Sequence, residues 1–344
     1  MRSLHPCVGV DTRKTTSFHS RSAKARFWVL FALISSVGVG CALLLLTYKN
    51  PMPFGIEQFW LIAYRRLHAV TALLLVAICQ ALATVAFQTV ANNRIITPSI
   101  MGFESLYRVI HTTTVFFFGA AGLIAADNLG MFVLQLVLMV GLSLLLYSWL
   151  LTSKTANIHA MLLVGIVIGG GLGSVATFMQ RMLTPSEFDV LLARLFGSVN
   201  NANPDYFPIS ALLIALAGGF IVLNAKKLNV LALGRDATMN LGIEHTRLSV
   251  GILIAVAVLM AVSTALVGPM TFLGFLVATL AYQAADTYDH RLVLPMAVAI
   301  AFSVLSSAYF IMNHIFYAQG VVSIIIELVG GSVFLIVLVK KGRL

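Results

Sequence analysis

Charged residues are scarce in this chain of 344 residues: they make up 10% of it, against 60% for hydrophobic residues. A soluble domain is about a quarter charged, so this chain has too little polar surface to cover a globule in water. Its mean hydropathy of +0.97 agrees with that reading. Cysteine is scarce as well. Cys7, Cys41 and Cys79 show no pairing or ligand spacing, which implies neither a disulfide nor a metal site.

Several motifs that would carry chemistry are missing. The chain has no G-x-x-x-x-G-K-[ST] phosphate-binding loop, so we expect it to bind no ATP by that route. It also has no H-E-x-x-H, and its eight histidines are scattered rather than clustered. An enzyme would need a grouped nucleophile, base or metal set. The sequence therefore predicts no catalytic residue, no metal ligand and no cofactor held by the chain itself.

Long apolar runs dominate instead. Each is about the length that an α-helix needs to cross a bilayer, and no alternating strand pattern recurs. The sequence predicts an all-α polytopic membrane protein with about ten spans. A short helix at 187–198 is too brief to cross. The expected spans are 27–47, 69–90, 99–125, 130–151, 158–180, 207–224, 248–268, 271–285, 292–313 and 320–339.

The net charge of +10 is placed at the ends of the spans rather than along a nucleic-acid face. Basic residues precede the first span and follow the last, so the positive-inside rule predicts that both termini are cytoplasmic. We expect residues 1–26 to form a basic cytoplasmic segment and residues 27–344 to form the transmembrane domain. The terminal basic residues are Arg2, Arg13, Lys14, Arg21, Lys24, Arg26, Lys340, Lys341 and Arg343.

A polar segment at about 225–247 interrupts the apolar runs and holds charges of both signs. Gly234 and Gly242 are turn residues, and Leu233, Ala237 and Leu241 are spaced i, i+4, i+8. We expect short amphipathic helices here, on a cytoplasmic surface that a soluble partner contacts. The alternative is a solvated loop in which the leucines are incidental.

The second span ends in a turn that contains Asn93, Thr97 and Pro98. Proline is pre-shaped for the first turn of a helix, and a threonine before it can cap that helix. By itself this pattern indicates a plain re-entry turn between two spans.

Three motifs in order resemble the iron-siderophore and cobalamin permease family of type II ABC importers. The first is the turn, where Gln88, Asn93, Pro98 and Gly102 match and Arg94 stands where the family usually has a proline after the asparagine. The second is the family's L-N-x-L-x-L-G-x-x-A-x-x-L-G segment. Its matches here are Leu228, Asn229, Leu231, Leu233, Gly234, Ala237, Leu241 and Gly242.

The third motif resembles the family's G-P-x-x-F-x-G-L-x-x-P-H-x-x-R. Its matches are Gly268, Pro269, Phe272 and Gly274. A Gly-Pro at a span boundary breaks the helix, and a small residue lets neighbouring helices approach closely. The chain departs from the pattern at Ala278, Thr279 and Tyr282, which puts in doubt any local role of the family's proline, histidine and arginine.

The resemblance covers roughly residues 27–340 and implies a ten-span permease subunit of an ABC importer in the bacterial inner membrane. Gly330-Gly331 and the turn are similar to the branch for catecholate-type siderophores such as petrobactin. The implied partners are separate ATPases that bind ATP and Mg²⁺ and dock on residues 228–242, and a second permease copy or homologue. A periplasmic or lipid-tethered binding protein would dock on outer arginines, here Arg65 and Arg66.

Other assignments remain open at this point. A cobalamin or haem importer of the same fold would share every motif. A secondary transporter would need matched ionisable groups inside the membrane. Glu327 is one such group, and it either pairs with another helix, lines the path or lies at a subunit interface. The i, i+4 spacing of Glu104 and Arg108 predicts an ion pair. We expect the path itself to be lined by the second and neighbouring spans.

Overall fold

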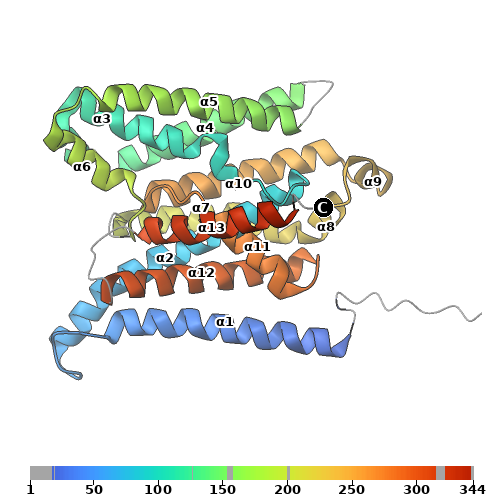
Figure 1. Ribbon diagram of the computed structural model, residues 1–344, viewed down its shortest axis with the longest axis horizontal. Coiled ribbons are helices and arrows are strands. Elements are labelled where there is room, and N and C mark those ends of the chain that lie inside the picture. Colours follow the sequence, from blue (N-terminus) through green and yellow to red (C-terminus); the bar gives the residue numbers. More distant parts are fainter. Residues whose placement is uncertain are drawn as a thin grey trace, which may run out of the picture.

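The computed structural model describes residues 18, 20–125, 127–152, 158–199, 202–314 and 322–341. Long helices run side by side along the longest axis of the molecule (Figure 1). One end carries the short helices α8 and α9, and the opposite end carries α6 and the α1–α2 connection. The helices are α1 (Arg21–Thr47), α2 (Glu57–Val90), η1 (Pro98–Met101), α3 (Phe103–Ala125), α4 (Leu129–Thr152), α5 (Ile158–Gln180), α6 (Pro185–Leu195), η3 (Pro204–Tyr206), α7 (Phe207–Leu223), α8 (Ala225–Leu231), α9 (Arg235–Asn240), α10 (His245–Val267), α11 (Leu273–Ala285), α12 (His290–His314) and α13 (Val322–Lys341).

Ten long helices therefore lie where ten spans are predicted, although not all of them are equally suited to cross a bilayer. Among the described residues, six are long and apolar enough by length and composition: α1, α2, α5, α7, α10 and α12. Shorter apolar stretches lie within α4, α11 and α13. The all-α polytopic fold class is confirmed.

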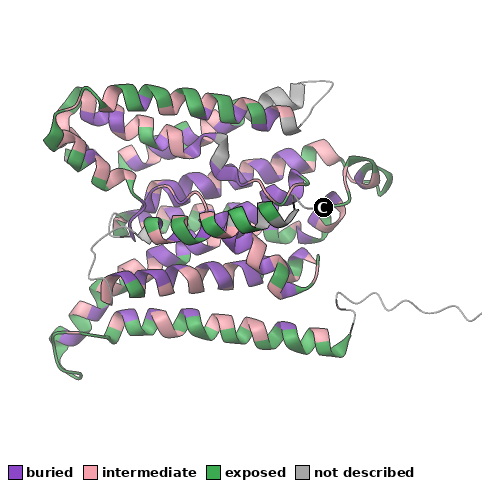
Figure 2. Ribbon diagram, viewed as in Figure 1, coloured by how far each residue is buried: buried purple, intermediate pink, exposed green. Residues whose placement is uncertain are grey.

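Helix α2 is the centre of the bundle. From Ala72 to Val90 almost every side chain is buried, and α10, α12 and α7 pack around it. Figure 2 shows this buried core, with α1 and much of α5 exposed at its edges. Many of the buried α2 residues are alanines, which let neighbouring helices approach closely. Over this stretch α2 is enclosed within its own chain, and our expectation that the second and neighbouring spans line the path stays a prediction.

Several boundaries differ from those expected. Helix α2 begins at Glu57, twelve residues before the predicted start at 69, and it therefore includes Arg65 and Arg66. Helix α1 begins at Arg21 inside the basic segment, where the Ser20 hydroxyl accepts a hydrogen bond from the Ala23 N–H. The residues of that segment before position 18, and position 19, lie outside the described residues.

The turn after α2 also differs in detail. Pro98 opens a 3₁₀ helix rather than an α-helix, and α3 begins only at Phe103. Thr97 occupies the N-cap position but makes no side-chain capping bond. Gly102 lies against Gly169 of α5, where a methyl group would come within 3.3 Å of the Gly169 Cα. The turn therefore docks the start of α3 onto α5.

Candidate functional site: a coupling surface and its anchoring network

The polar segment forms two short helices, α8 and α9, as predicted. Gly234 and Gly242 have φ of 93° and 78°, a conformation that glycine adopts without a steric penalty. The Thr238 hydroxyl lies within hydrogen-bond distance of Gly234 O, at 2.6 Å, and of Val230 O, at 3.1 Å. These contacts hold α9 against α8 as one unit.

Three large apolar side chains around α9 are exposed: Leu233 at 65%, Met239 at 55% and Leu241 at 61%. Arg235 and Asp236 lie exposed between them. Apolar side chains grouped on a polar segment are typical of a surface that another protein covers. We call Leu233, Met239 and Leu241 the coupling surface. Met239 was not singled out from the sequence, although its position between Leu233 and Leu241 was a usable signal.

The remaining residues of the 228–242 motif are not part of this exposed surface. Leu228 is fully buried, and Asn229 faces the bundle. Ala237 is half-buried on α9, which covers only Arg235–Asn240, so Leu233 and Leu241 flank this helix instead of sharing one of its faces. The motif therefore has residues that face the bundle and anchor α8, and exposed residues that another protein can contact.

Asn229 anchors α8 to the start of α12 by three contacts. Its Nδ2 donates to Asp289 Oδ1 at 3.0 Å, and its Oδ1 accepts from the His290 N–H at 2.8 Å. The same Oδ1 lies 2.6 Å from His290 Nδ1. Because a carboxylate only accepts, the amide is oriented with Oδ1 toward the imidazole, and Nδ1 is then the donor.

The far side of the same imidazole reaches α2. His290 Nε2 lies 2.7 Å from the Thr89 hydroxyl, and both side chains are buried. One chain of hydrogen bonds thus joins α8, α12 and α2. Arg291 adds an ion pair to Asp289 at 2.8 Å on the exposed side. Sequence reasoning missed His290, because a lone histidine after a polar loop carries no pattern.

Two of the departures from the family motifs, Arg94 and Tyr282, meet at this end of the bundle. The Arg94 guanidinium lies 4.3 Å from the centre of the Tyr282 ring and 4.8 Å from that of Tyr288. Gln88 Nε2 donates to Arg94 O at 2.8 Å, and Asn93 Oδ1 accepts from the Ile95 N–H. A cation above an aromatic face is attracted to it. The arginine that replaces one family residue therefore contacts the tyrosine that replaces another.

At the α6 end, the two predicted docking arginines differ. Arg66 donates to the carbonyls of Leu45, Tyr48 and Lys49, at 3.2, 2.9 and 3.3 Å. These carbonyls close α1, where the last turn lacks helical partners. The Arg66 side chain therefore holds α1 to α2. Arg65 is exposed on the same helix.

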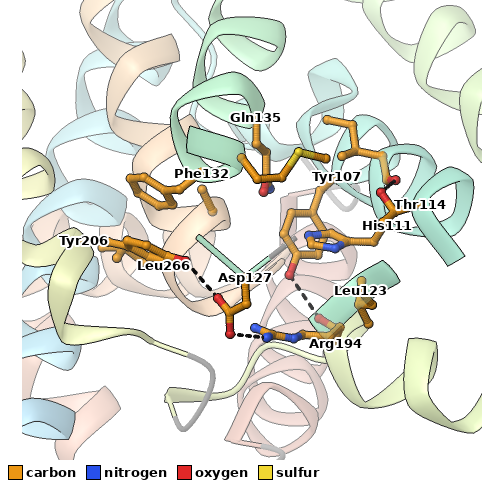
Figure 3. A pocket seen from close by; sticks show the side chains of 13 residues that line it. Tyr107, His111, Thr114, Leu123, Asp127, Phe132, Gln135, Arg194, Tyr206 and Leu266 are labelled. Carbon is orange, nitrogen blue, oxygen red and sulfur yellow. Dashed lines mark hydrogen bonds and ion pairs between the residues drawn. The ribbon is translucent and has the colours of Figure 1, made fainter. Parts of the chain in front are cut away.

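A polar cluster at the α6 end joins α3, the α3–α4 connection, α6 and η3 (Figure 3). Asp127 accepts from Arg194 of α6 at 2.6 Å and from the Tyr206 hydroxyl at 2.9 Å. The Tyr107 hydroxyl donates to Arg194 O at 3.1 Å. Burial acts to raise the pKa of Asp127, but the hydrogen bonds from Arg194 and Tyr206 outweigh it and the pKa is lowered. The sequence did not indicate this cluster, because its members are far apart in the chain.

Comparison with known proteins places this chain in a family. The model of the FecCD transport family matches residues 26–340. This chain belongs to the FecCD transport family. It is 51% identical over 334 residues to the petrobactin import system permease protein FatC of Bacillus anthracis, covering 97% of this chain and 94% of FatC. It is 38% identical to the petrobactin import system permease protein YclO of Bacillus subtilis, covering 81% of this chain and 89% of YclO.

The fold agrees with this family. A metal-chelate type ABC transporter in an inward-facing conformation superposes with a TM-score of 0.75 at 20% identity, covering 91% of this chain and 99% of the other. At that identity the likeness establishes the fold alone.

In this FecCD chain, the third motif packs against the last helix. Gly268 has φ of 97° and ends α10, as the Gly-Pro predicts. Phe272 lies against Gly330 of α13, where a methyl group would come within 2.8 Å of the Phe272 Cβ. A methyl group on Gly274 would overlap the Thr84 hydroxyl of α2. These glycines therefore set the spacing of α2, α11 and α13.

Glu104 and Glu327, the two acids inside expected spans of this FecCD chain, lie near the contact between Phe272 and α13. Glu104 Oε2 accepts from the Thr271 hydroxyl at 2.8 Å. The three ion pairs among the described residues do not include Glu104 with Arg108, so the expected pair is not formed. Glu327 is half-buried on α13 and forms none of these ion pairs either. No three histidines, cysteines or acids gather as metal ligands in the part of the chain that the structure describes.

Proposed function

We propose that this chain is the membrane-spanning permease subunit of an ABC importer that carries a ferric siderophore of the petrobactin class. The observation that supports this most is the 51% identity to FatC, which extends over nearly the whole of both chains. The phosphate-binding loop of ATPases is missing from the sequence. Separate subunits would therefore hold ATP and Mg²⁺ and supply the energy.

The chain lies in the bacterial inner membrane with the α8–α9 end toward the cytoplasm. Basic residues before α1 and at the end of α13 support this orientation under the positive-inside rule, with both termini inside. The α6 end, with the Asp127 cluster, then faces outward. A periplasmic or lipid-tethered binding protein docks there, and Arg65 is the better placed of the two arginines because Arg66 already closes α1.

The coupling surface is the site on which an ATPase subunit docks. Closure of the ATPases on ATP moves α8 and α9, which are held as one unit by Thr238. Asn229 passes that movement to α12 through His290, and Thr89 passes it on to α2. A second permease copy, or a homologous permease, completes the path. The helices then tilt to expose the path to one side at a time.

The test is iron uptake in a strain that lacks this gene. Radio-iron is presented on a panel of siderophores that includes petrobactin, with cobalamin and haem as controls. We expect the defect to be confined to petrobactin-class chelates and to be restored by the wild-type gene. A Gly234→Val/Leu241→Asp double variant that still inserts should not restore it.

Other outcomes would replace the proposal. A defect confined to cobalamin or haem would keep the fold and overturn the substrate. Loss of uptake on collapse of the ion gradient, with ATP maintained, would indicate a secondary transporter. Purification in mild detergent without any ATPase subunit would count against the coupling surface.

A further inference from the structure

A groove between α3 and α5 carries two arginines on a face that the chain itself leaves uncovered. Its volume is about 430 Å³. Arg108 lies one and a half turns into α3, and Arg181 directly follows the end of α5. Both side chains are exposed. The other lining residues are Gly170, Gly173, Ser174, Thr177 and Phe178.

The part of this face near the end of α5 is more polar than the exposed face of α1. On α1 the exposed side chains are large and apolar, as contact with lipid requires; they include Trp28, Val29, Leu33 and Val37. On α5 the exposed positions 170, 174, 177 and 181, toward the end of the helix, follow one another at helical spacing and are small, polar or basic, whereas the exposed side chains nearer its start, Leu163, Ile166 and Val167, are large and apolar. A charged arginine side chain is costly to place in hydrocarbon. The polar part of the α3–α5 face is therefore suited to border water or a second permease rather than lipid.

The arginines keep their hydrogen-bonding capacity. Within the described ranges, neither guanidinium makes a hydrogen bond or an ion pair. Glu104 and Glu327 are close enough to Arg108 to interact with its charge. Glu104, however, already accepts from Thr271, and neither acid is within ion-pair distance of Arg108.

The rest of the groove leaves room for a ligand. The hydroxyls of Ser174 and Thr177 donate to Gly170 O at 2.9 Å and Gly173 O at 2.8 Å, within their own helix. Their lone pairs stay available as weak acceptors. The Phe178 ring is 65% exposed and offers an aromatic face. A guanidinium presents a fork of donors that suits carboxylate or catecholate oxygens.

We propose that this groove is a wet part of the translocation path in which Arg108 and Arg181 attract an anionic ferric chelate. The inference rests on the proposed function for its substrate. Arg181, at the outer end of α5, meets the chelate first, and Arg108 follows deeper along α3. Two exposed cations hold such a ligand weakly, because water screens them, which lets the cargo move on.

The first test does not depend on the substrate. Cys7, Cys41 and Cys79 are replaced by serine or alanine, and a Ser174→Cys variant of the assembled transporter is treated with anionic and cationic methanethiosulfonates of similar size. We expect the thiol to react, and to favour the anionic reagent. Arg108→Gln should lower the ratio of anionic to cationic rates by about tenfold, because one nearby charge is removed.

A Leu33→Cys variant on the exposed apolar face of α1 is the matched control, and it should react with neither reagent. If the Ser174→Cys thiol is as unreactive as this control, both with and without ATP, the groove is not wet. If the ratio is unchanged by both Arg108→Gln and Arg181→Gln, the arginines do not select for anions. Either result overturns the inference and leaves the proposed function standing.

The second test measures transport. The Arg108→Gln/Arg181→Gln double variant should raise the KM for ferric petrobactin about tenfold at equal membrane levels, while Arg108→Lys/Arg181→Lys stays within about threefold of wild type. Arg21→Gln, at the exposed start of α1, should have no effect. Unchanged KM in the double Gln variant contradicts the inference. If instead the wild-type chain restores no ferric uptake, the proposed function fails. The ratio of anionic to cationic reaction rates at the Ser174→Cys thiol then still shows whether the groove is wet and attracts anions.

Discussion

At the scale of single residues, the departures from the family pattern are the most instructive positions. In the sequence, Arg94 and Tyr282 each read as a loss, of a proline and of an arginine. In the structure, the guanidinium of one lies over the ring of the other, with Tyr288 beside them. One departure thus supplies a cation and the other an aromatic ring that the cation contacts. Comparing motifs one position at a time cannot reveal such a pair.

This pairing predicts a measurable coupling. Arg94→Gln and Tyr282→Leu should each destabilise the purified protein, and the double variant should lose less than the sum. The expected coupling is about 0.5–1 kcal/mol, the range for a cation over an exposed aromatic ring. A double-mutant cycle on thermal or denaturant unfolding measures it. Strict additivity would mean that the two side chains do not interact.

The Asp127 cluster predicts a pH dependence. Arg194 and Tyr206 lower the pKa of Asp127 in the folded state, so its contribution to stability is present above the unfolded pKa of about 3.9 and is lost as the pH falls through the folded pKa. Asp127→Asn should therefore lower the Tm by a few degrees at pH 7, with a difference that shrinks below about pH 4. Thermal unfolding in detergent across this range checks it. A difference that stays constant with pH would show that the charge is not involved.

At the scale of elements, α8 is the joint between the coupling surface and the bundle. It is only seven residues long, and Leu228 and Asn229 face inward from it. A helix so short is stabilised by its tertiary contacts rather than by its own hydrogen bonds. The connection to α12 therefore depends on the side chain of Asn229.

Asn229→Ala should uncouple the transporter. It leaves His290 N–H and Nδ1 without their partner, a loss of about 1–3 kcal/mol. We expect the ATPase to co-purify and to hydrolyse ATP, while chelate uptake falls at least tenfold. Lys226→Ala, an exposed residue of the same helix, is the control. Normal uptake by Asn229→Ala at wild-type membrane levels would mean that movement reaches α12 by another route.

The packing of α11 on α2 gives a second prediction at this scale. A methyl group on Gly274 would overlap the Thr84 hydroxyl, whereas one on Gly219 of α7 would meet nothing within 4 Å. Gly274→Ala should therefore destabilise the protein by roughly 1–3 kcal/mol, the usual cost of overpacking. Gly219→Ala should not, and adding Thr84→Ala should recover part of the loss. Equal Tm values for the two alanine variants would contradict the close approach.

At the scale of the whole molecule, the coupling surface predicts how the subunits assemble. Leu233→Asp/Leu241→Asp should abolish co-purification with the ATPase, because two apolar side chains would be replaced by charges that the interface must desolvate. The chain itself should still fold, since both side chains are exposed. Leu212→Asn, exposed on the apolar helix α7, is the matched control for an exposed leucine outside this surface. Retention of the ATPase by the double variant would place the docking site elsewhere.

Much of the fold could be predicted because hydropathy acts through local runs of sequence. The ten long helices, the two short helices at 225–247 and the helix break at Gly268 follow from apolar length and from glycine positions. The start of α2 was misplaced by twelve residues because Arg65 and Arg66 look like the end of a span. Arg66 is tolerated inside the helix because it reaches three carbonyls in and just after the last turn of α1, a contact that no local pattern reveals.

The candidate site, too, could be predicted only in the part that depends on local sequence. The sequence by itself determined that this is a polytopic helical membrane protein with a polar segment between two spans, because bilayer thickness and backbone satisfaction leave few other solutions. Its three motifs indicated the permease family. Only the tertiary structure decided which residues of that segment face outward, that Asn229 holds His290, and that Arg108 and Arg181 share a groove. These depend on which faces of separate helices meet. That choice is made by packing between distant segments, and no single segment encodes it.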